Sequence, residues 1–205
     1  MSPLTFVAIS GSLRRGSHNT GLLRALQRLA PSDVSIDLFE GLGALPHFDQ
    51  DLEDRPAPAP VADLRRRVRR ADGVIIATPE YNSSIPGVLM NALDWLSRPA
   101  HDPCLRAKPV AVLGASPSQF GTARAQIVLR QVLHRIQAPV VAHPEVTVFR
   151  SHRCFAADGT LTRDETTEGL LRDLLSGLIH LSEPASGAPP AAVPGSRPRS
   201  VQVRT

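Results

Sequence analysis

The sequence is poor in the residue types that form metal centres and disulfide frameworks. It contains 205 residues but only two cysteines, Cys104 and Cys154, which are isolated and make neither a disulfide framework nor a zinc-ligand spacing. The seven histidines include no i, i+4 pair and have no cysteine at ligand spacing. The sequence therefore predicts free thiols and no metal site.

Long apolar runs and a leader peptide are also lacking. No stretch approaches the roughly 20 apolar residues of a membrane helix. The first ten residues contain neither a basic segment nor a small-residue cleavage site, and we interpret them as a first strand. These features predict a cytoplasmic protein that does not bind a membrane.

The net charge of +4 is modest, and much of it comes from one arginine-rich helix. Its arginines are Arg65, Arg66, Arg67, Arg69 and Arg70. They fall opposite an apolar stripe of the same helix, as is typical of a solvated helix face. Because no aromatic residues are interleaved with them, the sequence does not favour a nucleic-acid partner.

Apolar runs alternate with helical periodicities along the chain, which is typical of a parallel sheet covered by helices. Strands are predicted at residues 4–9, 34–39, 73–78 and 108–115, and in two short pieces at 140–142 and 146–149. Helices are predicted at residues 19–30, 86–98, 121–136 and 164–181, and in the arginine-rich segment. The helix at 121–136 is expected to turn Ile127 inward. This pattern predicts an α/β fold with a doubly wound five-stranded parallel sheet in the order 2-1-3-4-5.

The composition changes near the C-terminus. From residue 184 the chain is rich in Pro, Ala, Gly, Ser and Arg and has no apolar period. Such a segment cannot bury enough apolar surface to order itself. We therefore expect one domain over residues 1–183 and a disordered tail over residues 184–205.

Polar residues follow the first predicted strand, at a position that the strand order places at the topological switch point. The candidate binding residues here are Ser10, Ser12, Arg14, Ser17, His18, Asn19 and Thr20. Hydroxyls, an amide and a guanidinium at a helix N-terminus suit a phosphate group. A plain helix cap at Ser17 or Asn19 is the structural alternative. The spacing matches neither a nucleoside-triphosphate loop nor a dinucleotide fingerprint.

The loop after the third strand faces this segment across the switch point. It consists of Pro79, Glu80, Tyr81 and Asn82 and carries the only tyrosine of the chain. Tyr81 could simply cover a strand end, but beside a phosphate loop a flat heteroaromatic ligand explains it better. The loop after the fourth strand adds Ser116, Phe120 and Gly121. Together the three loops predict a mononucleotide site.

These loops resemble those of the NAD(P)H-dependent FMN reductases, a flavodoxin-like family that includes quinone, azo-dye and chromate reductases. The resemblance rests on Gly11-Ser12-Leu13-Arg14 with Gly16-Ser17 and Asn19, on Pro79-Glu80-Tyr81-Asn82 with Ile85-Pro86-Gly87, and on Gly114-Ala115-Ser116 with Gly121-Thr122. It covers about residues 4–182. It implies the flavodoxin-like fold, bound FMN, and NADPH or NADH as hydride donor.

The resemblance also implies roles for individual residues. Ser10, Arg14, Ser17 and Asn19 would hold the FMN phosphate. The loop of residues 79–82 would line the isoalloxazine, largely through backbone groups. Ser116 and the Phe120-Gly121 turn would support the ribityl chain or the other edge of the ring. His18 lies where the residue of the family varies, and no residue is predicted to act as a general acid or base.

Several alternatives stay open from the sequence. An FMN-binding electron carrier that never meets nicotinamide is the first, although carriers usually have an acidic docking surface and this chain is net basic. A regulatory subunit with an empty crevice is the second. The small-molecule acceptor could be a quinone, an azo compound, a metal oxyanion or a flavin. The resemblance implies a homodimer or homotetramer, with the helix at 86–98 as an interface element.

Overall fold

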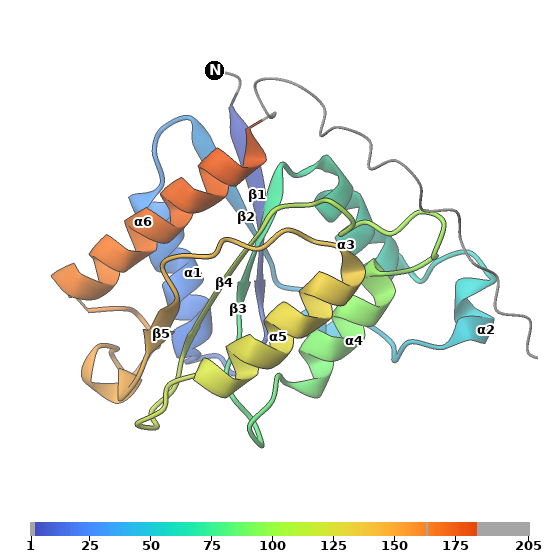
Figure 1. The fold of residues 1–205 in the computed structure, drawn as a ribbon. Helices are drawn as coiled ribbons and strands as arrows, with labels where there is room; N and C mark the ends of the chain where they lie inside the picture. Colours follow the sequence, from blue (N-terminus) through green and yellow to red (C-terminus); the bar gives the residue numbers. More distant parts are fainter. Residues whose placement is uncertain (1–2, 163, 184–205) are drawn as a thin grey trace, which may run out of the picture.

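A computed structural model describes residues 3–162 and 164–183 of the chain, in which a central parallel sheet is covered by helices on both faces (Figure 1). The strands are β1 (Leu4–Ser10), β2 (Val34–Phe39), β3 (Gly73–Ala77), β4 (Val110–Ala115) and β5 (Val146–Val148). All neighbouring strands are parallel, in the order β2-β1-β3-β4-β5. The predicted fold and strand order are confirmed. The predicted tail at 184–205 lies outside the described residues, so the division of the chain stays a prediction.

Two layers of helices enclose the sheet. The helices are α1 (His18–Leu29), α2 (Gln50–Glu53), α3 (Ala59–Arg70), α4 (Gly87–Leu96), α5 (Ala123–Ile136) and α6 (Glu165–Ser182), with short 3-10 turns η1 (Leu42–Ala44) and η2 (Ser151–Arg153). In Figure 1, α1 and α6 lie on one face of the sheet and α3, α4 and α5 on the other. The sheet is thus buried on both sides, as a parallel sheet requires.

The alternation of side chains along β3 explains the two cores. Val74 and Ile76 pack toward α3, α4 and α5, whereas Ile75 and Ala77 pack toward α1 and α6. Every residue of β3 is buried. At about 25 cal/mol per Å² of buried apolar surface, these two cores supply the main driving force for folding.

The structure corrects the expectation for the inner face of α5. Ile127 was expected to face inward, but its side chain is 58% exposed. The buried stripe follows Ala125, Leu129 and Leu133, which are spaced four residues apart. Ile127 lies two residues after Ala125, which is a rotation of roughly 200° around the helix. Its side chain therefore faces outward.

The fifth strand is shorter than its two predicted pieces. Only Val146–Val148 pairs with β4, while Val140 makes an isolated bridge to Val110. Both cysteines are free thiols, as predicted: Cys104 is buried and Cys154 is half-buried. Burial, followed by a hydrogen bond to Asp164, raises the pKa of the Cys154 thiol, which keeps it protonated and unreactive near neutral pH.

The arginine-rich helix α3 is only partly the solvated face that its sequence suggests. Its apolar stripe is fully buried at Val61, Leu64 and Val68. Arg67, however, donates two hydrogen bonds to Asp37 of β2, at 2.7 and 2.8 Å, and therefore ties the helix to the edge of the sheet.

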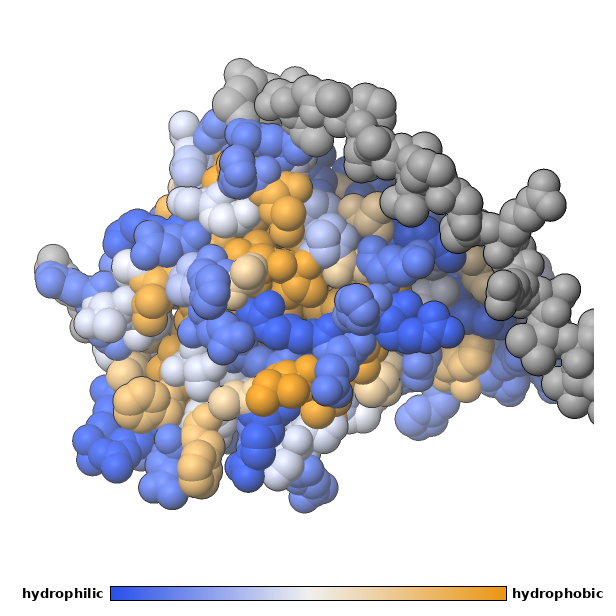
Figure 2. All heavy atoms as spheres, viewed as in Figure 1, coloured by the Kyte–Doolittle hydropathy of each residue, from blue (hydrophilic) through white to orange (hydrophobic). Residues whose placement is uncertain are grey.

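Figure 2 shows hydrophilic residues across much of the viewed face, with hydrophobic patches between them.

None of the helices in the described part of the chain is long and apolar enough to cross a lipid bilayer. Within residues 3–162 and 164–183, no group of three or more His, Cys, Asp or Glu side chains is placed to hold a metal ion.

Candidate functional site

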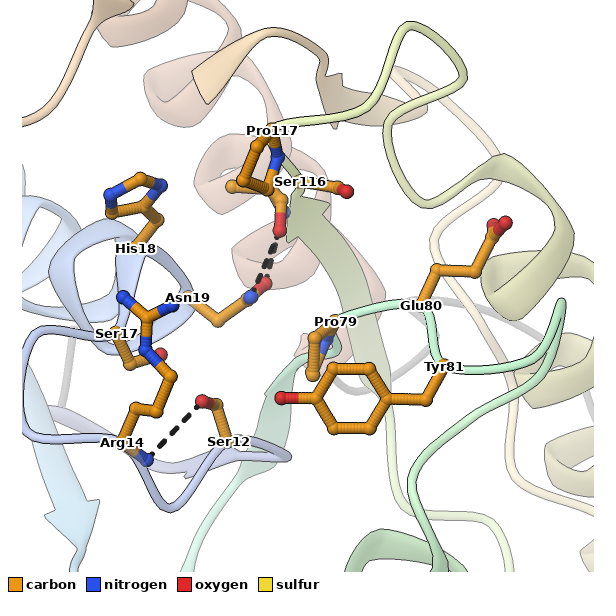
Figure 3. Close-up of a pocket in the computed structure, with 11 residues that line it drawn as sticks. Ser12, Arg14, Ser17, His18, Asn19, Pro79, Glu80, Tyr81, Ser116 and Pro117 are labelled. Carbon is orange, nitrogen blue, oxygen red and sulfur yellow. Dashed lines mark hydrogen bonds between the residues drawn. The ribbon is translucent and has the colours of Figure 1, made fainter. Parts of the chain in front are cut away.

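Three loops meet at the carboxyl edge of the sheet because β1, β3 and β4 are adjacent and parallel. They line a cavity of about 80 Å³ that is open to solvent (Figure 3). It is lined by Ser12, Arg14, Ser17, His18, Asn19, Pro79, Glu80, Tyr81, Ala115, Ser116 and Pro117. Two backbone hydrogen bonds join the ends of the strands that carry these loops: Gly11 donates to Ala77 at 2.8 Å, and Thr78 donates to Leu113 at 2.9 Å.

Most of the predicted site residues come together here, and five do not line the cavity. Ser10 and Thr20 lie on the opposite side of the first loop and line a neighbouring hollow with Arg24. Asn82, Phe120 and Gly121 are not part of either lining. Their contact with a bound ligand therefore stays a prediction.

The first loop caps α1 and has features that favour an anion. Ser17 is the N-cap of α1, and its hydroxyl accepts a hydrogen bond from the Thr20 N–H at 3.3 Å. The remaining N–H groups of the first turn have no partner within the helix and, with the helix dipole, favour a negative group. The first turn of α1 contains no acidic residue that would compete for this position.

Hydroxyl groups hold the first loop in shape. The Thr20 hydroxyl donates to the Ser10 hydroxyl at 2.8 Å, and the Ser12 N–H donates to the same oxygen at 3.3 Å. Ser10 is only 8% exposed, and its hydroxyl accepts both of these hydrogen bonds. The Arg14 guanidinium donates to the Gly16 carbonyl at 2.9 Å, which folds this exposed side chain back toward the start of α1.

Asn19 has a structural task that the sequence did not reveal. Its carboxamide accepts from the Ala115 N–H at 2.9 Å and donates to the Ala115 carbonyl at 3.0 Å. Both bonds are buried and tie the start of α1 to the end of β4, as the dashed lines in Figure 3 show. These bonds use one of the two N–H donors of the carboxamide, and the contact of Asn19 with a phosphate stays a prediction.

The second loop presents a ring to the cavity. Tyr81 and Ser84 exchange two backbone hydrogen bonds of 3.0 Å around Asn82 and Ser83, both with positive φ. Such a pair of left-handed residues makes a tight type I′ turn. In Figure 3 the Tyr81 ring extends from this turn toward the first loop. It is 50% exposed, so a ligand in the cavity can contact it.

Glu80 anchors the second loop instead of contacting the cavity with its carboxylate. Figure 3 shows its side chain pointing away from Tyr81. The carboxylate accepts from the backbone N–H groups of Arg124 and Ala125 at 3.0 and 3.2 Å, and forms an ion pair with the Arg124 guanidinium at 2.6 Å. It therefore caps α5 from outside the helix, at the end where a negative charge is favourable.

A segment that sequence reasoning missed packs behind residues that line the site. Residues 149–162 follow β5, and Ser151 of this segment donates from its N–H to the Ser116 carbonyl at 3.1 Å. Gly159 lies against Gly16, and an added Cβ at Gly159 would be 2.9 Å from the Gly16 carbonyl carbon. Gly159 also has a φ of +85°, so glycine is required here for two reasons. The Asp158-Gly159 turn was the one signal in the sequence.

His18 connects the segment 149–162 to the first loop. Its Nδ1 atom lies 2.7 Å from the Ser151 hydroxyl, and its ring stacks on Phe155 with a centroid distance of 4.5 Å. Burial, then the charges of Arg14 and His152, lowers the pKa of the imidazole below its usual value.

A second hollow opens beside Tyr81 and is mainly apolar. It is lined by Gly11, Leu13, Arg14, His47, Tyr81, Pro86, Gly87 and Val88. His47 was not predicted; its loop is fixed to α4 because Asn91 and Trp95 both donate to the Pro46 carbonyl at 2.9 Å. The site therefore has a polar, cationic part at α1 and an open, apolar part at Tyr81.

The fold and these two parts define a class: a flavodoxin-like protein with a mononucleotide site at the switch point. Residues 4–152 match the model of the NADPH-dependent FMN reductases. The chain belongs to this family, and the predicted family, cofactor and enzyme class are confirmed. The alternatives of an electron carrier and of a regulatory subunit are thereby set aside.

Individual relatives agree with this assignment. An NAD(P)H-dependent FMN reductase of Pseudomonas aeruginosa is 41% identical over 168 residues, which is 82% of this chain and 90% of that protein. A 2-hydroxy-1,4-benzoquinone reductase of a Burkholderia species is 40% identical over 167 residues, with the same coverage of 82% and 90%. The solved structure of the flavoenzyme FerB, an NAD(P)H:(acceptor) oxidoreductase of Paracoccus denitrificans, has a TM-score of 0.77 at 35% identity and covers 87% of this chain and 97% of that one.

Proposed function

We propose that the chain binds FMN in the cavity and passes electrons from NAD(P)H to a quinone-type acceptor. The observation that carries this proposal is the arrangement of the cavity, in which the cationic loop at the N-terminus of α1 faces the Tyr81 ring. The donor set fits FMN: backbone N–H groups, hydroxyls and a guanidinium for the phosphate, and an aromatic residue for the ring.

The residues have distinct tasks in this proposal. Arg14, the Ser12 and Ser17 hydroxyls and the first N–H groups of α1 bind the phosphate. The backbone of Pro79, Glu80 and Tyr81 positions the isoalloxazine, and Ser116 supports the chain between the two. Gly11 allows close packing beneath the loop, because an added Cβ would lie 3.2 Å from Leu89 and Pro79.

Protein acids and bases are not needed for the transfer itself. When bound, FMN takes a hydride from NAD(P)H and returns two electrons to an acceptor. The protein holds the reacting ring and leaves one side of it open through the hollow beside Tyr81. The backbone dipoles of the three loops can stabilise negative charge that develops on the ring. We assign no general acid or base.

A quinone is the acceptor that the site favours. Leu13, Pro86 and Val88 give the open hollow an apolar lining, which suits a flat, weakly polar ring better than an oxyanion. The similar Burkholderia protein is a 2-hydroxy-1,4-benzoquinone reductase, which supports the same acceptor class. We also expect a homodimer or homotetramer in solution, as the family resemblance implies.

Anaerobic reduction tests this function. We expect the flavin absorption of FMN-loaded protein to bleach on addition of NADPH or NADH, and to return on addition of 1,4-benzoquinone without oxygen. Comparing the bleaching rates of the two nucleotides gives the donor preference. Protein that retains FMN but is bleached by neither nucleotide would contradict the proposed reduction, and bleached protein that benzoquinone does not reoxidise would contradict the acceptor class.

A further inference from the structure

We propose that His18 is a ligand of the FMN phosphate that gains a proton when the cofactor binds. This inference rests on the proposed function and adds proton uptake to it. His18 lines the cavity together with Arg14 and Ser17, at the end where the phosphate is expected. Its position is the first residue of α1, so it adds a titratable donor to the N–H groups of that helix turn.

The geometry leaves one ring nitrogen for a ligand. Nδ1 lies 2.7 Å from the hydroxyl of Ser151, which is completely buried, and the ring is stacked on Phe155 at an interplanar angle of 10°. Within residues 3–162 and 164–183, no hydrogen bond is made by Nε2. The stacking and the hydroxyl contact fix the plane of the ring, so Nε2 is the atom that can donate to a phosphate oxygen.

The Ser151 hydroxyl accommodates both charge states of the ring. A hydroxyl donates one hydrogen bond and accepts others. When His18 is neutral, the hydroxyl donates to Nδ1 and the proton resides on Nε2. When His18 is protonated, Nδ1–H donates to the hydroxyl instead. Gain of a proton therefore requires only rotation of a hydroxyl, with no loss of a contact.

The charges around the ring oppose protonation until an anion arrives. Arg14 faces His18 from the first loop and His152 faces it from η2, while Phe155 is apolar and the first turn of α1 is uncharged. Burial, then the proximity of Arg14 and His152, lowers the pKa of His18, so the free site holds a neutral imidazole near neutral pH. A phosphate dianion reverses the sign of the local charge and raises the pKa. Proton uptake is therefore expected in the window between the lowered and the raised value.

Calorimetry measures this uptake directly. FMN is titrated into cofactor-free protein at about pH 7 in two buffers of different ionisation enthalpy, and the difference in heat gives the number of protons bound. We expect more than about half a proton for the natural chain, because a neighbouring opposite charge shifts a pKa by about 1 to 3 units. We expect almost none with riboflavin, which fills the ring site but carries no phosphate.

Two variants separate this role from packing. His18→Phe keeps the stack on Phe155, and His18→Gln keeps a polar group beside Ser151, but neither can gain a proton. Relative to either variant, the FMN affinity of the natural chain should rise about tenfold from about pH 8.5 to about pH 6.5. This comparison removes the titration of the FMN phosphate itself, whose second pKa lies near 6. His101→Gln, in the loop after α4, is the matched histidine control and should behave like the natural chain.

The outcomes are distinct. FMN binding with equal proton uptake and equal pH dependence in the natural chain and both His18 variants would overturn the role of His18 and leave the proposed function standing. Equal uptake with riboflavin would show that the proton does not follow the phosphate and would also overturn it. Failure of the natural chain to bind FMN at any pH would instead overturn the proposed function.

Discussion

The two sides of the cavity are built differently. On the α1 side, Ser10, Ser17 and Asn19 are almost completely buried. The Ser10 and Ser17 hydroxyls both accept hydrogen bonds from Thr20, and the Asn19 carboxamide is bonded to Ala115 of β4. On the other side, the Tyr81 ring is half-exposed and the adjoining Leu13 side chain is 58% exposed. One side is thus a rigid, prearranged donor set, and the other is an accessible apolar surface.

This difference matches the two tasks of the proposed enzyme. A cofactor that stays bound benefits from donors that are already ordered, because no entropy is lost in arranging them. The nicotinamide and the acceptor bind one after the other at the same ring, so the ring must be accessible from solvent. The rigid side should therefore control cofactor retention and stability, and the open side should control the use of substrates.

Asn19→Ala should disrupt the rigid side most. It leaves the N–H and the carbonyl of Ala115 without partners in a buried place, at a cost of about 1 to 3 kcal/mol for each group. We expect the free energy of unfolding to fall by roughly 2 to 6 kcal/mol, as measured by urea denaturation, with weaker FMN binding. Asn82→Gly is the matched control, because it changes an exposed asparagine with positive φ and should leave stability nearly unchanged. A stability loss no larger than that of the control would show that the Asn19 bridge does not hold α1 to β4.

Arg14→Ala should weaken FMN binding without unfolding the protein. Arg14 lines the cavity, whereas Arg15 on the same loop does not. A hydrogen bond from a guanidinium to a phosphate contributes about 1.5 to 3 kcal/mol, so we expect the Kd of FMN to rise about tenfold to a hundredfold. Quenching of flavin fluorescence gives the Kd, and Arg15→Ala is the control. If both variants bind FMN equally well, the assignment of Arg14 to the phosphate is wrong.

The sequence predicted which loops meet at the site better than it predicted what packs against them, for a physical reason. The strand order places the residues that follow β1, β3 and β4 at one edge, so their meeting needs only the topology. The segment at residues 149–162 joins this edge through contacts such as that of His18 with Ser151, 133 residues away in sequence, which no local period signals. His47 was missed because its position depends on hydrogen bonds from α4 to Pro46.

The sequence also predicted which residues lie at the site better than it predicted their hydrogen-bond partners. An asparagine at a helix start suits either a cap or an anion, and only the structure shows that the Asn19 carboxamide is bound to Ala115. In the same way, Glu80 was correctly placed in the second loop, but its carboxylate caps α5. Side-chain direction at the end of a strand depends on neighbours that the local sequence does not specify.

Tyr81→Ala should give the smallest effect and should act mainly on the open side. Loss of an aromatic contact costs about 1 kcal/mol, so we expect the KM for 1,4-benzoquinone to rise about fivefold while the Kd of FMN changes less. Steady-state kinetics at saturating NADPH or NADH gives the KM. Tyr81→Phe keeps the ring and should match the natural chain, because the Tyr81 hydroxyl makes no hydrogen bond within residues 3–162 and 164–183. If Tyr81→Ala instead raises the Kd of FMN as much as Arg14→Ala does, both sides of the cavity hold the cofactor equally, and the contrast between a rigid and an open side does not describe how the site works.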